Sequence, residues 1–258
     1  MQLQINGQGQ AALVTGGASG LGAEVVRQLA QSGARVSILD VNLDGAQALA
    51  QEVGGHAAAC DITDTASVEA ALASARAAHG PARILVNCAG IGGAKRLVGK
   101  DGTAMPLGDF SRIINVNLIG TFNMIRLAAA EMIAQTPLED GERGVIISTA
   151  SVAAYDGQVG QAAYAASKGG ITSLTLPLAR DLAQFGVRVM TIAPGLFLTP
   201  LLYKLPEEVQ QSLAASIPFP KRLGKAEEFA QLALHIVGNL SLNGEVIRLD
   251  GALRLPPR

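Results

Sequence analysis

The sequence contains no tryptophan, and aromatic residues make up only 3% of its 258 residues. Large rings therefore cannot form its core. Hydrophobic residues nevertheless reach 49%, so the core must consist mainly of Ala, Val, Ile and Leu. Charged residues are also scarce, at 16%, which excludes an intrinsically disordered chain. A core of small and branched aliphatic side chains is typical of a parallel sheet that helices cover on both faces.

Cysteine is nearly absent from the sequence. The two cysteines, Cys60 and Cys88, are too few and too far apart for a disulfide framework or a zinc site. We expect both to be small packing residues in a reducing compartment, and we expect no metal site. The 20 basic and 21 acidic residues nearly balance, and no basic block occurs, so nucleic acid is not an expected partner.

No targeting segment or membrane span is predicted. The polar residues 1–10 lack the charged start and the apolar stretch of a signal peptide. No stretch approaches the ~20 apolar residues that cross a bilayer. We therefore expect a cytoplasmic protein.

Short apolar runs alternate with longer amphipathic segments along the whole chain. This alternation, with few hairpin signals, predicts an α/β fold with a doubly wound parallel sheet of about seven strands. The sequence shows no domain boundary, so residues 1–258 are expected to form a single domain. The expected strands cover residues 11–15, 35–40, 56–60, 84–87, 144–148, 187–193 and 245–249. The expected helices cover residues 20–31, 44–53, 65–79, 108–135, 161–185 and 226–237, and Pro177 should kink or interrupt the fifth of them.

A glycine-rich turn follows the first expected strand directly. Its spacing is Gly-x-x-x-Gly-x-Gly, and glycine lets the backbone turn sharply and approach a pyrophosphate. The amides and the dipole of the following helix attract the anion. Such a turn can also be a plain strand–helix connection, but its place after the first strand favours phosphate binding. The expected cofactor contacts in this turn are Gly16, Ser19, Gly20, Leu21 and Gly22.

Asp40 ends the second expected strand and indicates which dinucleotide binds. A carboxylate at this place accepts hydrogen bonds from both ribose hydroxyls and repels a 2′-phosphate. The nearby basic residue, Arg35, starts the same strand and so lies at the wrong end to hold that phosphate. The sequence therefore predicts NAD rather than NADP.

The ends of the third and fourth expected strands add further cofactor contacts, because ligands bind at the carboxyl ends of strands in a doubly wound sheet. Asp61 is expected to meet the adenine amino group, and Ile62 its ring face. The small residues Cys88, Ala89 and Gly90 let the chain pass close to the cofactor. Taken alone, each of these residues fits an ordinary loop better than a binding site.

Tyr164 and Lys168 lie four residues apart on an expected helix, so their side chains face the same way. Oxidation of an alcohol removes a hydroxyl proton as well as a hydride, and a free phenol with a pKa of about 10 is a poor base. We expect the Lys168 ammonium to lower the pKa of Tyr164 and also to bind the nicotinamide ribose. Ser151 is expected to hold the substrate oxygen. The pair also occurs by chance on helix surfaces, although this chain has only three tyrosines.

Together these motifs resemble the short-chain dehydrogenase/reductase family over nearly the whole chain. Residues 15–22 resemble its Thr-Gly-x-x-x-Gly-x-Gly motif, residues 164–168 its Tyr-x-x-x-Lys motif, and residues 87–90 its Asn-Asn-Ala-Gly element. The resemblance implies a seven-stranded Rossmann-type fold and a homotetramer or dimer. It also implies a catalytic tetrad and contacts of Phe197 and Thr199 with the nicotinamide end. In that tetrad, Asn117 holds a water in a proton relay, Ser151 orients the substrate, Tyr164 is the acid/base and Lys168 assists.

Within the family, residues 157–164, 192–197 and 243–251 look closest to the type II 3-hydroxyacyl-CoA dehydrogenases, a branch that includes enzymes active on hydroxysteroids. This resemblance implies NAD-dependent interconversion of an (S)-3-hydroxyacyl-CoA and a 3-oxoacyl-CoA in fatty acid metabolism. Ser151, Gln158 and Tyr164 are then the substrate contacts. Two alternatives stay open. One is a 3-oxoacyl-carrier-protein reductase; such enzymes usually use NADPH, and Asp40 argues against NADPH. The other is a catalytically silent nucleotide-binding scaffold, which the tetrad opposes.

Overall fold

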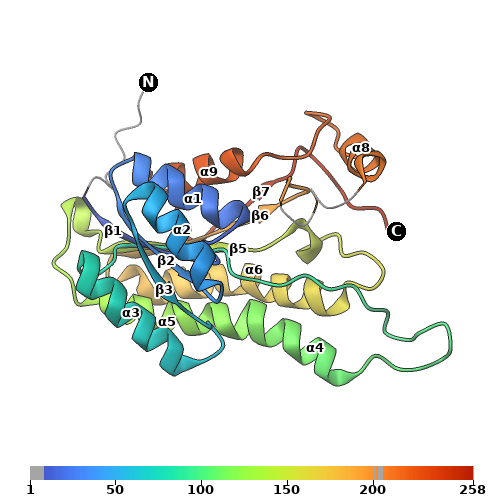
Figure 1. The fold of residues 1–258 in the computed structure, drawn as a ribbon, viewed down its shortest axis with the longest axis horizontal. Coiled ribbons are helices and arrows are strands. Elements are labelled where there is room, and N and C mark those ends of the chain that lie inside the picture. Colours follow the sequence, from blue (N-terminus) through green and yellow to red (C-terminus); the bar gives the residue numbers. More distant parts are fainter. Residues whose placement is uncertain (1–8, 200–201, 203–205, 258) are drawn as a thin grey trace.

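The computed structural model describes residues 9–199, 202 and 206–257. Within this part of the chain, seven parallel strands form one sheet in the order β3-β2-β1-β4-β5-β6-β7 (Figure 1). The strands are β1 (Ala11–Thr15), β2 (Arg35–Asp40), β3 (His56–Ala59), β4 (Ile84–Asn87), β5 (Gly144–Thr149), β6 (Val187–Pro194) and β7 (Val246–Leu249). The helices are α1 (Gly20–Gln31), α2 (Leu43–Val53), α3 (Thr65–His79), α4 (Leu107–Ile114), α5 (Thr121–Ile133), α6 (Ala162–Ala183), α8 (Glu207–Ala215) and α9 (Ala226–Gly238). The single-domain doubly wound fold predicted from the sequence is thereby confirmed.

Helices cover both faces of the sheet, as Figure 1 shows. Helices α1, α2 and α9 lie on one face, where the side chains of Val14 and Val86 are buried against them. Helices α3, α5 and α6 lie on the other face, where Leu13 and Leu85 are buried. Successive side chains of a strand point to opposite faces, so strands covered on both sides read as uninterrupted apolar runs.

The order of the strands places a ligand site at one end of the sheet. Strand β1 pairs with β2 on one side and with β4 on the other, so the direction of winding reverses between β1 and β4. Ligands of doubly wound sheets bind in the crevice outside the carboxyl ends of the strands at such a reversal. The loops that follow β1, β2, β4 and β5 therefore meet at this crevice.

Most predicted elements agree with the structure to within one or two residues, and the differences have physical causes. Helix α8 was not predicted. The expected helix 108–135 contains a short π-helix, η1 (Asn115–Gly120), between α4 and α5. Pro177 does not interrupt α6, which runs without a break from Ala162 to Ala183. The packing of α6 against β6 and α4 holds it helical despite the missing amide donor.

The continuous helix Leu107–Ile133 bears on the expectation that the chain has no membrane-spanning stretch. By length and composition it could cross a membrane, although the sequence alone suggested no such stretch. Half of its most apolar window is buried inside the protein. Two buried asparagines on it also bond to other segments, Asn117 to Ser167 and Asn123 to the carbonyl of Ile62. These are the features of a core helix.

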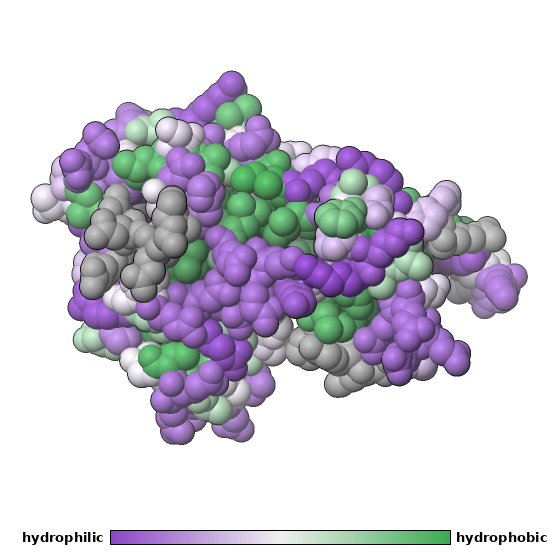
Figure 2. Space-filling view, turned by 90° about the horizontal axis from the view of Figure 1, so that it is seen from above, coloured by the Kyte–Doolittle hydropathy of each residue, from purple (hydrophilic) through white to green (hydrophobic). Residues whose placement is uncertain are grey.

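The surface mixes charges of both signs with apolar areas. Hydrophilic residues make up most of the face in Figure 2, and hydrophobic residues gather in separate areas between them. Opposite charges are paired, for example Arg27 with Glu52 and Arg76 with Glu131. This arrangement agrees with the nearly balanced charge of the sequence.

Candidate active site

A cavity of about 850 Å³ lies at the carboxyl ends of the strands and brings nearly all the predicted site residues together. The loops that follow the first six strands contribute to its wall. Gly20 and Asn117 are the two predicted residues that do not line it. Those that do are Gly16, Ser19, Leu21, Gly22, Asp40, Asp61, Ile62, Cys88, Ala89, Gly90, Ser151, Gln158, Tyr164, Lys168, Phe197 and Thr199.

The turn after β1 has the close backbone approach that a diphosphate group needs. Gly16 has a φ of +62°, and a Cβ there would lie 2.6 Å from the backbone of Ala89. A Cβ on Gly22 would lie 2.2 Å from the carbonyl oxygen of Gly16. Helix α1 begins at Gly20, and within the described residues the Ser19 side chain makes no capping bond to it. The first amides of α1 are thus suited to an anion.

Asp40 is fixed at the cavity wall by two backbone amides. Its Oδ2 accepts a hydrogen bond from the amide of Ala18 at 3.0 Å, and its Oδ1 accepts one from the amide of Asn42 at 2.9 Å. Arg35 lies at the other end of β2, where its Nε donates to the carbonyl of Gly9 at 3.1 Å. The carboxylate and the arginine are thus separated by the length of β2, as predicted.

The loop after β3 also reaches the cavity and is held from behind by a residue that the sequence did not reveal. The carboxylate of Asp61 accepts hydrogen bonds from the amide and hydroxyl of Thr63. The buried Nδ2 of Asn123, on α5, donates to the carbonyl of Ile62 at 3.0 Å. Asn123 therefore positions the part of the wall that was predicted to face adenine.

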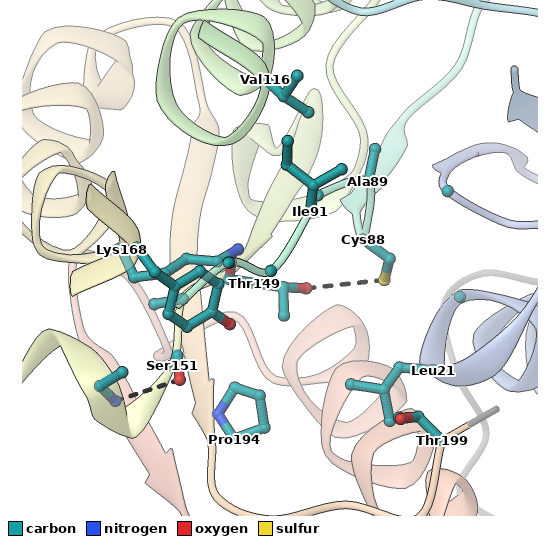
Figure 3. Close-up of a pocket in the computed structure, with 18 of the residues that line it drawn as sticks. Leu21, Cys88, Ala89, Ile91, Val116, Thr149, Ser151, Lys168, Pro194 and Thr199 are labelled. Carbon is teal, nitrogen blue, oxygen red and sulfur yellow. Dashed lines mark hydrogen bonds between the residues drawn. The ribbon is translucent and has the colours of Figure 1, made fainter. Parts of the chain in front are cut away.

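Ser151, Tyr164 and Lys168 meet at one end of the cavity. Tyr164 and Lys168 lie on the same side of α6, with the Lys168 Nζ 5.9 Å from the centre of the tyrosine ring. The Nζ also donates to the carbonyl of Thr149 at 2.7 Å. Figure 3 shows Thr149, Ser151 and Lys168 together on one side of the cavity. The two helical residues and the end of β5 thus supply the three groups predicted to act on an alcohol.

Burial dominates the protonation of this pair. It raises the pKa of Tyr164, and a hydrogen bond with Ser151 opposes the rise. Burial also lowers the pKa of Lys168 to about 8. The prediction that Lys168 lowers the pKa of Tyr164 is therefore not met in this structure, because desolvation of the phenolate dominates and the opposing effect comes from Ser151.

Asn117 is completely buried and lies behind the cavity wall rather than in it. Its Oδ1 accepts a hydrogen bond from the amide of Ile91 at 2.8 Å. Its Nδ2 donates to the carbonyl of Ile91 at 2.9 Å and to the Ser167 hydroxyl at 3.0 Å. The side chain therefore ties the segment after β4 to α6, one residue from Lys168.

The cysteines are free thiols with raised pKa values. Burial raises the pKa of Cys60 to about 12 and that of Cys88 to about 11. Cys88 accepts a hydrogen bond from the Thr149 hydroxyl at 3.7 Å (Figure 3). Both thiols therefore stay protonated near neutral pH, as expected of packing residues.

Leucine side chains from two distant segments form an apolar part of the wall. Leu196 and Leu202 come from the segment after β6, and Leu255 comes from the C-terminal end of the chain. No motif marks Leu255, because it reaches the cavity only through tertiary contacts. Among the described residues, no group of three or more His, Cys, Asp or Glu side chains is placed to hold a metal ion.

Comparison with known proteins agrees with this geometry. Residues 10–210 match the family model described as short chain dehydrogenase. The 3-hydroxyacyl-CoA dehydrogenase type-2 of Homo sapiens is 53% identical over 253 residues, which cover 97% of each chain. A 3-oxoacyl-[acyl-carrier-protein] reductase of Thermotoga maritima is 34% identical, covering 95% of this chain and 98% of that one. The crystal structure of 3-hydroxyacyl-CoA dehydrogenase type-2 from Mycobacterium avium superimposes with a TM-score of 0.93 over the whole of both chains, at 44% identity.

Proposed function

Because this chain belongs to the short-chain dehydrogenase family and is an oxidoreductase, we propose that it is an NAD-dependent 3-hydroxyacyl-CoA dehydrogenase. One observation carries the proposal: Ser151, Tyr164 and Lys168 meet in the cavity that the glycine turn and Asp40 also line. Relatives at about 53% identity that bear this name support the choice of substrate. The reaction is the interconversion of an (S)-3-hydroxyacyl-CoA and a 3-oxoacyl-CoA, a step of fatty acid metabolism, with hydroxysteroids as a further substrate class.

The cavity fits a dinucleotide, since the first amides of α1 suit its diphosphate and the Asp40 carboxylate suits its adenosine ribose. When bound, the nicotinamide supplies the hydride acceptor. The Ser151 hydroxyl holds the alcohol oxygen beside the Tyr164 phenol. Tyr164 removes the hydroxyl proton, and the Lys168 ammonium stabilises the phenolate that does so. Ser151 and Tyr164 are only partly exposed and Lys168 is buried, so water has limited access to the three groups and their interactions are strengthened.

The direct test of the function is NADH formation from (S)-3-hydroxybutyryl-CoA and NAD by the purified protein. Turnover is expected with 3-hydroxyacyl-CoA substrates, and a parallel series should include hydroxysteroids and acyl-carrier-protein thioesters. Activity confined to carrier-protein substrates would instead favour the 3-oxoacyl-carrier-protein reductase alternative, which the relative at 34% identity keeps open. NADH binding without turnover of any alcohol would support the silent scaffold.

Replacing Asp40 with asparagine should shift the cofactor preference towards NADP. The substitution removes the charge that faces the ribose, and its single side-chain oxygen can still accept a hydrogen bond from one of the two amides, that of Ala18 or that of Asn42. Two like charges 4 Å apart repel by about 1 kcal/mol in water and about 4 kcal/mol near a protein surface. We therefore expect the ratio of kcat/KM for NADP to that for NAD to rise roughly tenfold or more. Steady-state kinetics with both cofactors measure it, and an unchanged ratio would contradict the role of Asp40.

The two reaction directions should depend differently on pH. Burial raises the pKa of Tyr164, so the phenolate is the minor form near neutral pH and its fraction grows as pH rises. Alcohol oxidation needs the phenolate, so its kcat/KM should increase with pH from 6 to 8. Ketone reduction needs the phenol, so its kcat/KM should not increase over the same range. Initial rates in both directions test this, and an oxidation rate independent of pH would exclude Tyr164 as the titrating base.

We also propose a homotetramer. The elements η1, α5 and α6 are neighbours on one face of the sheet. Each exposes an apolar side chain to solvent, namely Ile119, Phe122 and Leu176 in that order. Contact with other copies of the chain would bury this face and remove the apolar area from water.

A further inference from the structure

The last described residues of the chain, 253–257, are tied to the body of the protein at three points. The Nε2 of Gln158 donates to the carbonyl of Pro256 at 3.1 Å, and the amide of Val159 donates to that of Pro257 at 3.0 Å. The Nη2 of Arg248, on β7, donates to the carbonyl of Leu253 at 3.0 Å. Chain ends are usually poorly ordered unless they are tied down. These bonds and the restricted φ angles of two prolines hold this C-terminal tail in place.

Arg248 joins the tail to the segment that carries the catalytic serine. Its Nη2 forms an ion pair with Asp156 at 2.6 Å, and its Nε forms one with Asp250 at 2.8 Å. Asp156 lies five residues after Ser151, in the connection between β5 and α6. Tail, edge strand and catalytic segment therefore form one connected unit beside the cavity that Ser151 lines.

Leu255 is the tail residue that reaches the cavity. It lines the wall together with Leu196 and Leu202. It also packs against a cluster of buried residues that includes Ile217 and Leu253. Its position is thus set from behind by packing and from both sides along the chain by hydrogen bonds.

We propose that the C-terminal tail is a specificity element and that Leu255 limits the length of the acyl chain that the enzyme accepts. This inference rests on the proposed function, since it assigns Leu255 to the acyl part of a 3-hydroxyacyl-CoA. A fixed apolar side chain at the wall contacts a chain that reaches it and obstructs a longer one. One methylene more or less in such a pocket changes kcat/KM by roughly 10- to 200-fold.

The test measures kcat/KM for 3-hydroxyacyl-CoA substrates of four and ten carbons with Leu255→Ala and Leu255→Phe. Alanine enlarges the pocket, so the ratio of long-chain to short-chain kcat/KM should rise roughly tenfold. Phenylalanine fills it, so the same ratio should fall roughly tenfold. Leu255→Val provides a smaller increase if the alanine variant is unstable. Opposite shifts from opposite changes in volume distinguish a contact with substrate from a general loss of packing.

Leu213→Ala is the matched control. Leu213 lies on α8 and packs against the same apolar cluster, but it does not line the cavity. Its substitution should lower the melting temperature and leave the chain-length ratio within about twofold. An unchanged chain-length ratio in the Leu255 variants, or a shift in the same direction in both, would overturn the inference. The proposed function would still stand if the wild-type protein turns over 3-hydroxyacyl-CoA substrates. Absence of wild-type turnover at every chain length would overturn both.

Discussion

Tyr164→Phe is expected to lower kcat for alcohol oxidation by roughly 10²- to 10⁴-fold, the usual contribution of a positioned acid/base. The substitution removes one oxygen atom and leaves the ring that fills this part of the wall. The variant keeps the glycine turn and Asp40, so NADH should bind within about threefold of the wild-type affinity. Steady-state kinetics give kcat, and titration of NADH fluorescence gives the dissociation constant. Turnover within tenfold of the wild type would remove Tyr164 from the mechanism.

Tyr155→Phe is the control for this experiment. Tyr155 is half exposed, does not line the cavity, and packs its ring against the guanidinium of Arg248 at 5.0 Å. Phenylalanine keeps that contact, so activity and NADH affinity should both stay close to wild type. A loss of activity in both variants would point to a shared effect on folding. Loss in Tyr164→Phe alone identifies the hydroxyl as the group that matters.

The features that could be predicted from the sequence are those fixed by short stretches of chain. The glycine spacing after β1 sets a local backbone path, and Asp40 lies at the crevice because it is the last residue of β2. The pairing of Tyr164 with Lys168 needs only the period of one helix. In each case a few neighbouring residues determine where the side chain lies, so their sequence pattern was sufficient.

The features that were missed depend on contacts between distant parts of the chain. Asn123 supports a loop 61 residues away in sequence, and Arg248 contacts Asp156 across 92 residues. Leu255 reaches the cavity only because the tail is bound by residues after β5. The raised pKa of Tyr164 likewise follows from burial, which spacing on a helix does not reveal. No periodicity or motif contains this information.

Arg188 also depends on contacts with distant parts of the chain, and its replacement by alanine should strongly destabilise the fold. It lies on β6 with its side chain only 8% exposed and forms an ion pair with Glu142 at 2.8 Å. Its guanidinium also donates to four backbone carbonyls, those of Ile236 and Val237 in the last turn of α9 and those of Asn239 and Leu242 in the chain that follows it. The last carbonyls of a helix have no intrahelical donor, and a cation there is favoured by the helix dipole.

Alanine at position 188 removes the guanidinium donor from the Glu142 carboxylate and from these carbonyls, of which only those of Ile236 and Asn239 also accept a bond from a backbone amide outside the helix ladder. Breaking a buried pair by removing one partner costs about 3–5 kcal/mol, a large part of a typical total of about 5–15 kcal/mol. Arg188→Lys keeps the charge but lacks the planar fork that reaches all these oxygens, so it should be intermediate. Denaturant unfolding at one protein concentration measures the loss.

Arg27→Ala is the surface counterpart of this change, because Arg27 and its partner Glu52 are both exposed to solvent. Exposed pairs lose little when broken, since water replaces the partner. We therefore expect the unfolding midpoint of Arg27→Ala to stay close to wild type and that of Arg188→Ala to fall far below it. Similar midpoints for the two variants would show that the guanidinium of Arg188 is not what holds the end of α9 to β6. A fall in the Arg188 variant alone would assign that role to its donated hydrogen bonds.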